Sequence, residues 1–350
     1  MNATHAANDP SLPSVVLAEL KMGGFSPERL GEAQVFCEAF FARVGGGDAH
    51  LHTPVQWAAL VGSLLEFMQQ RQHGSASVRV LNPADANSGR SMLQIVTDDM
   101  PFLVDTVSMI VSAKLQIHAV IHPVLKVTRD ASGKLLSLGD AAGQGESLMH
   151  FEIDRVADAA EQEQLTAHVE AALDDVRAAV SDWSAMRDKA LAIANELPQR
   201  KLPIDAASVQ EASEFMNWIA ADNFTFLGYR EYEVADAEGD RVLRAIDASG
   251  LGILRANERS MAPRSLRTLA ASELPQSGST DAIILTKTNA RSHVHRAGYM
   301  DYIGVLQFGA DGRAVAEQRF LGLFSSNAYM ARPQDVPLVR HKVEAVLARS

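Results

Sequence analysis

A short apolar strand runs directly into an amphipathic helix between Thr97 and Thr106, through an acidic turn that contains a proline. Residues before the turn alternate with the two-residue period of a half-buried strand, and apolar residues after it recur at helical spacing. The first set is Leu93, Ile95 and Thr97, and the second is Leu103, Val107, Ile110 and Val111. A chain with this junction must combine strands and helices in one fold.

The turn itself carries the features of an anion site. Asp99 is placed to cap the backbone NH groups of the first helical turn, and Pro101 has the fixed φ of an early helical position. Free NH groups and the helix dipole favour an anion at such a point. Two interpretations stay open: a ligand site formed by Asp98, Asp99, Met100, Pro101 and Phe102, or a helix start with a purely structural role.

The elements after the junction read helix, strand, strand, helix. The two strands show alternating apolar residues, a turn separates them, and the final helix has an apolar stripe. These residues are Ile117, Ala119, Ile121 and Val127; Asp130–Gly133; Met149, Phe151 and Ile153; and Leu165, Val169, Leu173, Val176 and Val180. With Val78–Leu81 as a further strand, this is the element order of a ferredoxin-like sandwich.

Helices are expected before this unit, and a second unit after it. Apolar spacing around Phe36 and Leu64 predicts helices that either cover the sheet or contact a neighbouring subunit. The second unit begins with a helix at 209–219 and continues as an antiparallel sheet with flanking helices. Its strands are expected at 224–234, 241–246, 282–288, 299–308 and 313–324, with a hairpin turn at 309–312. The segment 257–281 is either a flexible loop or a segment ordered by partner domains.

Composition excludes several classes of function. The 350 residues are enough for two or three domains, and the net charge of -11 argues against nucleic-acid and anionic-membrane partners. The single cysteine, Cys37, is expected to be buried in a helix and suits a reducing compartment. Because no apolar run is long enough to span a bilayer and no signal peptide is evident, we expect a cytoplasmic protein.

Catalytic and cofactor motifs are weak. Gly143-Gln144-Gly145 lacks the third glycine and the strand-to-helix setting of a dinucleotide fingerprint, so no NAD site is expected in this segment. The pairs His118/His122 and His293/His295 are expected on solvated strand faces rather than at a metal. Arg291, His293, Arg296 and Arg319 form either an anion or subunit contact or the charged face of an ordinary sheet. No catalytic residue and no metal ligand is predicted.

Three separated stretches carry a family resemblance. They are Asp98–Val107, Asp222–Arg230, and the segment from His295-Arg296 through Tyr299–Val305 to Glu317–Phe324. Together they resemble the amino-terminal region of the large bacterial NAD-dependent glutamate dehydrogenases. The resemblance spans about residues 90 to 350.

The resemblance implies that catalysis lies outside this chain, in a domain that oxidatively deaminates glutamate to 2-oxoglutarate with NAD. It also implies an ACT-like module with Asp98–Phe102 as its ligand loop, and a PAS-like module after it. Many amino-acid-binding ACT modules have glycine after the proline, whereas this chain has the bulky Phe102. The implied role is regulation and assembly, with a ligand-insensitive oligomerisation scaffold or a stand-alone amino-acid sensor as alternatives.

The expected fold class is α+β, in five parts. They are an N-terminal tail and helices (1–77), the ACT-like βαββαβ domain (78–182), a connecting helix and linker (183–205), the PAS-like domain (206–332) and the start of a helix (333–350). Val336, Val339, Val343 and Val346 form the apolar stripe of that helix, which leads toward a missing remainder. Expected partners are the catalytic and other regulatory domains of the same polypeptide, a second copy of the chain, and an amino-acid effector.

Overall fold

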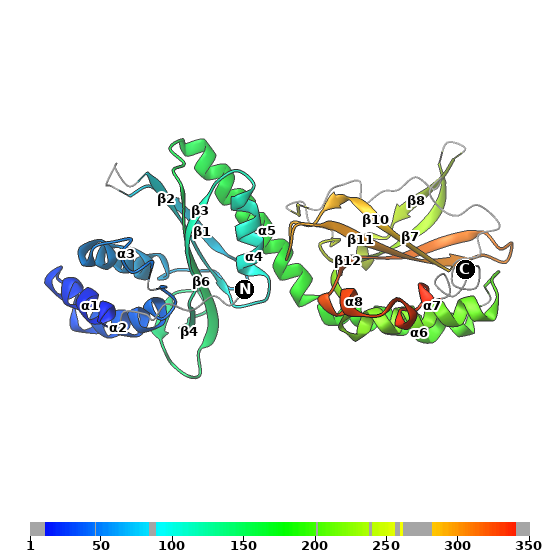
Figure 1. Cartoon of the computed structure of the whole chain (residues 1–350), viewed down its shortest axis with the longest axis horizontal. Coiled ribbons are helices and arrows are strands. Elements are labelled where there is room, and N and C mark those ends of the chain that lie inside the picture. Colours follow the sequence, from blue (N-terminus) through cyan, green and yellow to red (C-terminus); the bar gives the residue numbers. More distant parts are fainter. Residues whose placement is uncertain are drawn as a thin grey trace. The chain divides into compact units, whose positions relative to one another are not determined.

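The computed structural model describes residues 11–45, 47–83, 89–200, 202–237, 240–255, 260–261 and 282–340. The chain divides into two compact units, Met1–Leu173 and Asp174–Ser350. Each unit is built on its own antiparallel sheet with helices against it (Figure 1). The predicted α+β fold class is confirmed.

The first unit has three helices before its sheet. Its elements are α1 (Leu12–Met22), α2 (Pro27–Phe41), α3 (Pro54–Phe67), β1 (Ser77–Leu81), β2 (Arg90–Asp98), α4 (Leu103–Ser112), β3 (Ile117–Ile121), β4 (Val124–Arg129), β5 (Leu135–Leu138), β6 (Gln144–Asp154) and α5 (Ala159–Ser181), which continues past the unit boundary. The strand order is β1-β2-β6-β4-β5, and β3 also pairs with β6. The predicted sequence of a helix, strands and a helix is present, but the expected strand at 117–127 is divided into β3 and β4, and β5 is an addition that sequence periodicity missed.

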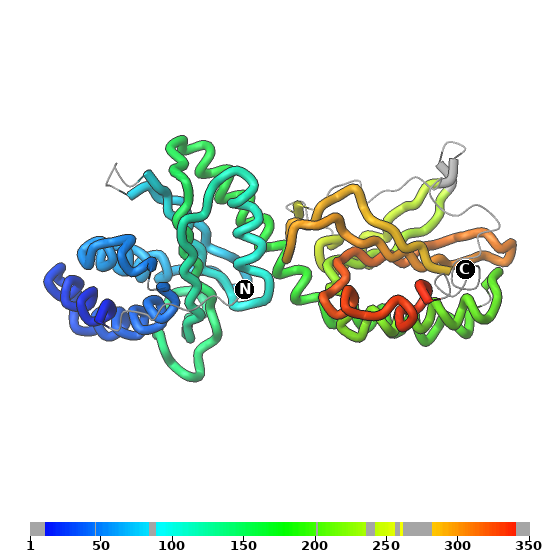
Figure 2. Tube along the Cα trace, viewed as in Figure 1, coloured from blue at the N-terminus to red at the C-terminus, as the bar shows by residue number. Residues whose placement is uncertain are grey.

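Strand β6 organises this sheet. One of its edges pairs with β2 from Arg90↔Asp154 to Asp98↔Glu146. The other edge pairs first with β3 and then with β4, so these two short strands act as one interrupted strand. The path of the chain through the sheet can be followed by colour in Figure 2. Both edges of β6 are therefore occupied, and it lies in the interior of the sheet.

The helices before the sheet begin at strong local signals. Ser26 accepts a hydrogen bond from the backbone NH of Arg29 at the start of α2. Thr53 and Gln56 form a reciprocal capping box at the start of α3. Both helices also carry proline in their first turn, where no NH is needed. These ends are satisfied by residues within three positions, so local sequence is enough to start both helices.

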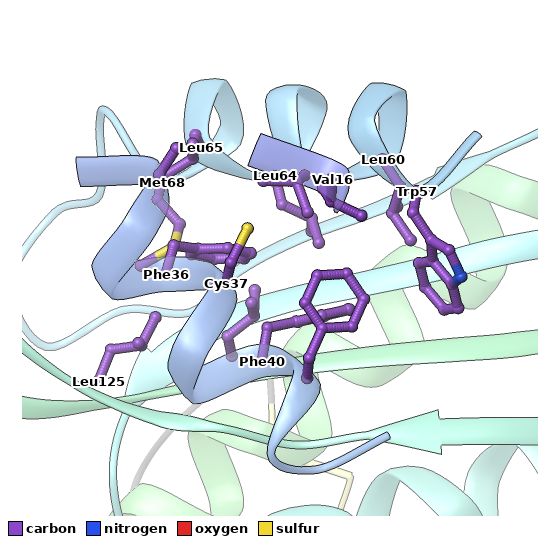
Figure 3. Packing of buried hydrophobic residues seen from close by; sticks show 14 of the residues in the cluster. Val16, Phe36, Cys37, Phe40, Trp57, Leu60, Leu64, Leu65, Met68 and Leu125 are labelled. Carbon is purple, nitrogen blue, oxygen red and sulfur yellow. The ribbon is translucent and has the colours of Figure 1, made fainter. Parts of the chain in front are cut away.

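Helices α1, α2 and α3 lie on one side of the first sheet, and α4 and α5 on the other (Figure 1). Their packing against the sheet is shown in Figure 3, where Phe36, Cys37 and Phe40 of α2 lie beside Leu125 of β4 in one buried cluster. Cys37 is buried in a helix, as predicted. Of the two roles considered for these helices, covering the sheet is the one observed within this chain.

The second unit consists of helices and an antiparallel sheet. Its elements after α5 are α6 (Trp183–Glu196), α7 (Ala206–Trp218), β7 (Phe224–Ala237), β8 (Asp240–Ala245), β9 (Leu251–Gly252), β10 (Ile283–Arg291), β11 (Tyr299–Phe308), β12 (Ala314–Phe324) and α8 (Ser326–Met330), with short turns of helix at Leu197–Gln199, Ile219–Asn223, Asp247–Ser249 and Pro333–Asp335. The order is β10-β11-β12-β7-β8, and β9 pairs with β7. The predicted hairpin turn is closed by a hydrogen bond from Gly309 N to Arg313 O.

Residues from α6 and α7 form one core with the second sheet. Met186 and Ile193 of α6 and Phe215 of α7 belong to the same buried cluster as Phe226 and Phe320 of the sheet. Because successive strand residues point to opposite faces, the residues next to Phe320 and Tyr229 point away from these helices. This alternation defines a second face of the sheet, which carries the charged residues discussed below.

Helices α5 and α6 are separate, because Asp182 between them leaves helical geometry and its carboxylate accepts hydrogen bonds from Gly252 N and Arg255. The expectation for the end of the chain needs correction. Val336 lies in a bend and Val339 in a turn, so neither belongs to a helix, while Val343 and Val346 lie outside the described residues. Of the expected loop at 257–281, only residues 260 and 261 are described.

The shared core of α2 and the sheet generates a stability prediction. Phe40 is fully buried and contacts the rings of Phe36, Phe41 and Trp57. We expect Phe40→Ala to destabilise this unit by about 3–5 kcal/mol, because a large aromatic side chain is lost from a packed site. Amide hydrogen exchange of β6, measured against denaturant, checks this value.

The control is Met22→Ala, at a side chain that is 73% exposed, which should change the free energy of unfolding by less than about 0.5 kcal/mol. Unaltered protection of the β6 amides in Phe40→Ala would show that the helices are not part of this core.

Candidate functional site

The carboxylate of Asp98 ends strand β2 and is already paired. It accepts a hydrogen bond from Nη2 of Arg71 at 2.7 Å, and the same nitrogen donates to Oε1 of Glu146 at 2.7 Å. Arg129 holds Glu146 from the other side, with Nε and Nη2 on its two carboxylate oxygens. Asp98 and Glu146 are direct cross-strand partners, so Arg71 bridges two like charges.

Burial and charge have opposite effects on the pKa of Glu146. Burial raises it, but the hydrogen bonds and charges of Arg129 and Arg71 outweigh this and hold the pKa below its usual value. The side chains of Arg71, Glu146 and Arg129 are each at most 4% exposed. This cluster therefore stays ionised and binds its own members, which leaves Asp98 as the only partly exposed member of the group at 33%.

Asp99 is engaged by the neighbouring strand. The hydroxyl of Ser147 donates to Oδ1 of Asp99 at 2.7 Å, and Nε2 of His122 lies 3.0 Å from the same hydroxyl oxygen. The pKa of His122 is lowered, mainly by burial. The prediction that Asp99 caps the helix is wrong, because the Ser147 hydroxyl takes its carboxylate and α4 begins four residues later at Leu103.

The last residues of the junction adopt a backbone that favours glycine. Phe102 precedes α4 with φ of 74° and makes no side-chain cap hydrogen bond. This left-handed conformation costs a non-glycine residue about 1–2 kcal/mol. Met100 and Phe102 are half-buried and Pro101 is exposed, two residues before the helix rather than within it. Phe102 thus stands in the conformation that a glycine at this position would adopt without strain.

A second buried group lies on the same sheet face and was missed by sequence analysis. The two carboxylate oxygens of Glu152 are hydrogen-bonded to Nε2 of His52 at 2.6 Å and to Nη1 of Arg90 at 2.6 Å. Its neighbour His150 is fully buried, with Nδ1 facing the amide of Gln94 and no hydrogen-bond partner at Nε2 among the described residues. Helices α2 and α3 cover this face of β6, so both residues are buried.

The pKa values of this group follow from its burial. Burial raises the pKa of Glu152, but hydrogen bonds from His52 and Arg90 outweigh it and lower the pKa to about 2. Burial lowers the pKa of His150 to about 4. The carboxylate of Glu152 is thus ionised beside Arg90, and His150 is neutral near pH 7. Their pKa values are too far from 7 for a general acid and base working near neutral pH.

The histidine pairs are neither solvated nor gathered. His118 contacts Asp154 and His293 contacts Asp175, with histidine side chains only 23% and 12% exposed. His293 and His295 lie in bends between β10 and β11, so they do not share a strand face as predicted. Within the described part of the chain, no group of three His, Cys, Asp or Glu side chains is arranged to hold a metal ion.

The suggested arginine group is also dispersed. Arg291 stacks on Tyr299, Arg296 donates to the carbonyl of Phe324, and His293 is held by Asp175. Arg319 is fully buried, so the expectation of an exposed charged sheet face is wrong for this residue. No helix in the described ranges is long and apolar enough to cross a membrane.

Comparisons with known proteins give the same family as the resemblance seen in the sequence. Residues 36–169 match the family model described as glutamate dehydrogenase, ACT1 domain. The chain is 32% identical to the NAD-specific glutamate dehydrogenase of Halomonas elongata, over 95% of this chain and 21% of the relative. The corresponding enzyme of Pseudomonas aeruginosa is 32% identical over 92% of this chain and 20% of its own length.

A more distant relative, the NAD-specific glutamate dehydrogenase of Mycobacterium tuberculosis, is 27% identical over 86% of this chain and 18% of its own length. The resemblance predicted from sequence is confirmed. The chain spans about a fifth of the length of the relatives it matches. The ACT1 match begins inside α2, so it includes helix α3, which packs on the sheet.

The strained backbone at Phe102 gives a test with a built-in control. We expect Phe102→Gly to be more stable than Phe102→Ala by about 1 kcal/mol, because both remove the ring but only glycine relieves the left-handed conformation. Urea denaturation of the two variants measures the difference. Equal stability of the two would show that the backbone strain at this position has no energetic weight.

The buried Glu152 predicts an acid-dependent loss of stability. Its pKa of about 2 lies below the usual 4.5, so its ionised form stabilises the fold above pH 4.5 and this contribution is lost as the pH falls toward 2. The contribution is about 3 kcal/mol. Glu152→Gln should flatten the fall of unfolding free energy between pH 4.5 and 2, whereas the exposed control Glu163→Gln should follow the parent chain. If the unfolding free energy of Glu152→Gln fell between pH 4.5 and 2 as steeply as that of the parent chain, Glu152 would not be the source of the acid-dependent loss.

Proposed function

We propose that this chain, which is similar over most of its length to one fifth of the NAD-specific glutamate dehydrogenases, is the N-terminal regulatory and assembly region of such an enzyme. The parent would deaminate glutamate oxidatively to 2-oxoglutarate and ammonium with NAD. In this proposal the catalytic residues and the NAD site belong to the remaining four fifths.

The glycine pair at residues 143 and 145 supports a non-catalytic role for this segment. A dinucleotide phosphate is bound where a glycine-rich turn leads into a helix N-terminus. Here the pair leads into strand β6, and Gly145 packs against Asp99. Glu146 and Glu152 also support this role, because each carboxylate is already bound by two basic side chains of this chain.

The choice between assembly and sensing depends on the β2–α4 junction, where both carboxylates already have partners within the chain. Asp98 is bound by Arg71, and Asp99 is bound by Ser147. An amino acid at Asp98–Phe102 would have to replace both interactions and also pass the half-buried ring of Phe102. We therefore favour a packing and assembly role for the junction, with an amino-acid sensor as the second candidate because the ACT1 match favours it.

Either role would act on catalysis through domain arrangement. A ligand or subunit contact changes the equilibrium between two arrangements only by its differential affinity for them. The proposed partners are therefore the other domains of the same polypeptide and a second copy of the chain. An effector that binds both arrangements equally would have no effect on activity.

Thermal unfolding of the chain against amino acids, 2-oxoglutarate and nucleotides separates the two candidates. A ligand at a hundred times its dissociation constant stabilises by about 2.7 kcal/mol. We expect no shift that depends on the junction. A selective shift that is lost in Asp98→Asn and Asp99→Asn, but kept in the exposed control Asp188→Asn, would replace assembly by sensing.

The assembly role has its own readout. Sedimentation velocity over a concentration series should show reversible self-association of the chain, and 2-oxoglutarate or glutamate should leave it unchanged. A monomer at every concentration, with no ligand response, would overturn both candidates. Glutamate-dependent NADH formation by the purified chain would contradict the non-catalytic proposal, and we expect none.

A further inference from the structure

Two buried arginines face each other on the second sheet. Arg230 of β7 and Arg319 of β12 are direct cross-strand partners. They lie on the face opposite α6 and α7, because their neighbours Tyr229 and Phe320 pack in the core with those helices. Their exposed fractions are 2% and 0%. Like charges directly opposite each other destabilise a sheet, and burial adds a desolvation cost of several kcal/mol for each ion.

Arg319 has compensating partners in this chain. Its Nε donates to Oε1 of Glu317 at 3.1 Å, and Glu317 also accepts from the hydroxyl of Tyr302. Its guanidinium carbon lies 3.7 Å from the ring centroid of Tyr232 and 5.0 Å from that of Tyr302. A carboxylate and two aromatic faces therefore balance the charge of Arg319.

Arg230 lacks such partners. Its guanidinium makes no hydrogen bond to the described residues, and its Nε is completely buried without an acceptor. The nearest carboxylate is that of Asp247, which lies 3.6 Å from Nη1 and is 79% exposed. A guanidinium has five N–H donors, and a buried charged donor without an acceptor costs more than a neutral one. The structure thus holds a buried cation that needs an acceptor.

The first sheet shows what balances such a pair. Asp98 and Glu146 are also like-charged cross-strand partners, and Arg71 bridges them with one nitrogen. No carboxylate of the described residues contacts both Arg230 and Arg319. Glu317 balances Arg319 from within the sheet, whereas Arg230 is balanced only by the exposed Asp247, at 3.6 Å from Nη1. A second carboxylate at hydrogen-bond distance would therefore neutralise Arg230 better than Asp247 does.

We propose that Arg230 anchors a binding site for a small molecule that carries a carboxylate, and that Asp247 occupies this place when the ligand is absent. Carboxylates match the planar guanidinium with two parallel hydrogen bonds, at the distances that Asp247 does not reach. Asp247 is 79% exposed, so it can leave Nη1 without being extracted from a packed core. Gly250 lies against the Nε and Nη2 side of the guanidinium, where a Cβ would be 3.2 Å from both nitrogens, so the ligand carboxylate would take the Nη1 side that Asp247 faces.

Thermal unfolding of the 350-residue chain in sodium acetate, against sodium chloride at the same ionic strength, tests this site. Acetate presents the carboxylate alone. We expect acetate to raise the melting temperature of the parent chain and to have no specific effect on Arg230→Gln. Arg244→Gln on the neighbouring strand β8, at a side chain that is 69% exposed, is the matched control and should respond like the parent.

A second variant tests the competition with Asp247. Asp247→Asn removes the resident carboxylate, so the acetate concentration for half of the maximal shift should fall several-fold. A merely structural Arg230 predicts the opposite pattern: Arg230→Gln would lower the melting temperature in chloride, and Asp247→Asn would leave the acetate response unchanged.

The proposal is overturned if acetate and chloride act alike on the parent chain, or if Arg230→Gln keeps the acetate shift. It is also overturned if phosphate stabilises the parent more than acetate does at equal ionic strength, because the site would then prefer a dianion. If Arg230→Gln does not fold, the acetate concentration that gives half of the maximal shift is compared between Asp247→Asn and the parent chain. A several-fold lower concentration in Asp247→Asn supports the site, and an equal one overturns it. A response lost in Arg230→Gln but kept in Asp98→Asn distinguishes this site from the β2–α4 junction.

Discussion

Burial of both faces of strand β6 is the constraint on which the first unit depends. Helices α1–α3 cover one face and α4 and α5 the other, so the polar residues of β6 must find partners inside the fold (Figure 1). Glu146 and Glu152 do so by drawing in Arg71 and His52, which come from the segments next to α3. These ion pairs fasten the helical layer to the sheet at two points, and the first of them also fixes Asp98. The geometry of the candidate junction is therefore a consequence of how β6 is buried.

The same constraint acts on the second sheet with a different outcome. Arg319 is neutralised by Glu317 and lies against aromatic rings, whereas Arg230 beside it has only an exposed carboxylate at 3.6 Å. The buried carboxylates of the first unit are thus held by hydrogen bonds within the fold, whereas Arg230 of the second unit is held only by this longer ion pair. The first unit has the features of a packed, internally balanced module suited to assembly. The second has the feature expected of a ligand site, which would place small-molecule control away from the β2–α4 junction.

For a segment proposed to regulate a much larger polypeptide, this division has a physical meaning. A carboxylate bound at Arg230 would take the place of Asp247 and so release the turn at Asp247–Ser249 from its ion pair. Its effect on a distant catalytic domain would then depend on whether that turn contacts other domains differently in two arrangements. The proposed assembly contacts and the proposed ligand site could be altered independently, because they involve different sheets.

Local sequence determined most of the elements, because apolar periodicity and capping are effects within a few residues. The expected strand at 299–308 coincides with β11, and the hairpin turn at 309–312 is present. Sequence did not determine how the polar residues are used. Ser147, forty-eight positions away, donates to the carboxylate of Asp99, and Glu152 of β6 is buried beneath the helices that precede the sheet. Only the strand register placed Arg230 opposite Arg319. Side-chain periodicity is a local property, whereas the partner of a buried charge is decided by which distant segments the fold brings beside it.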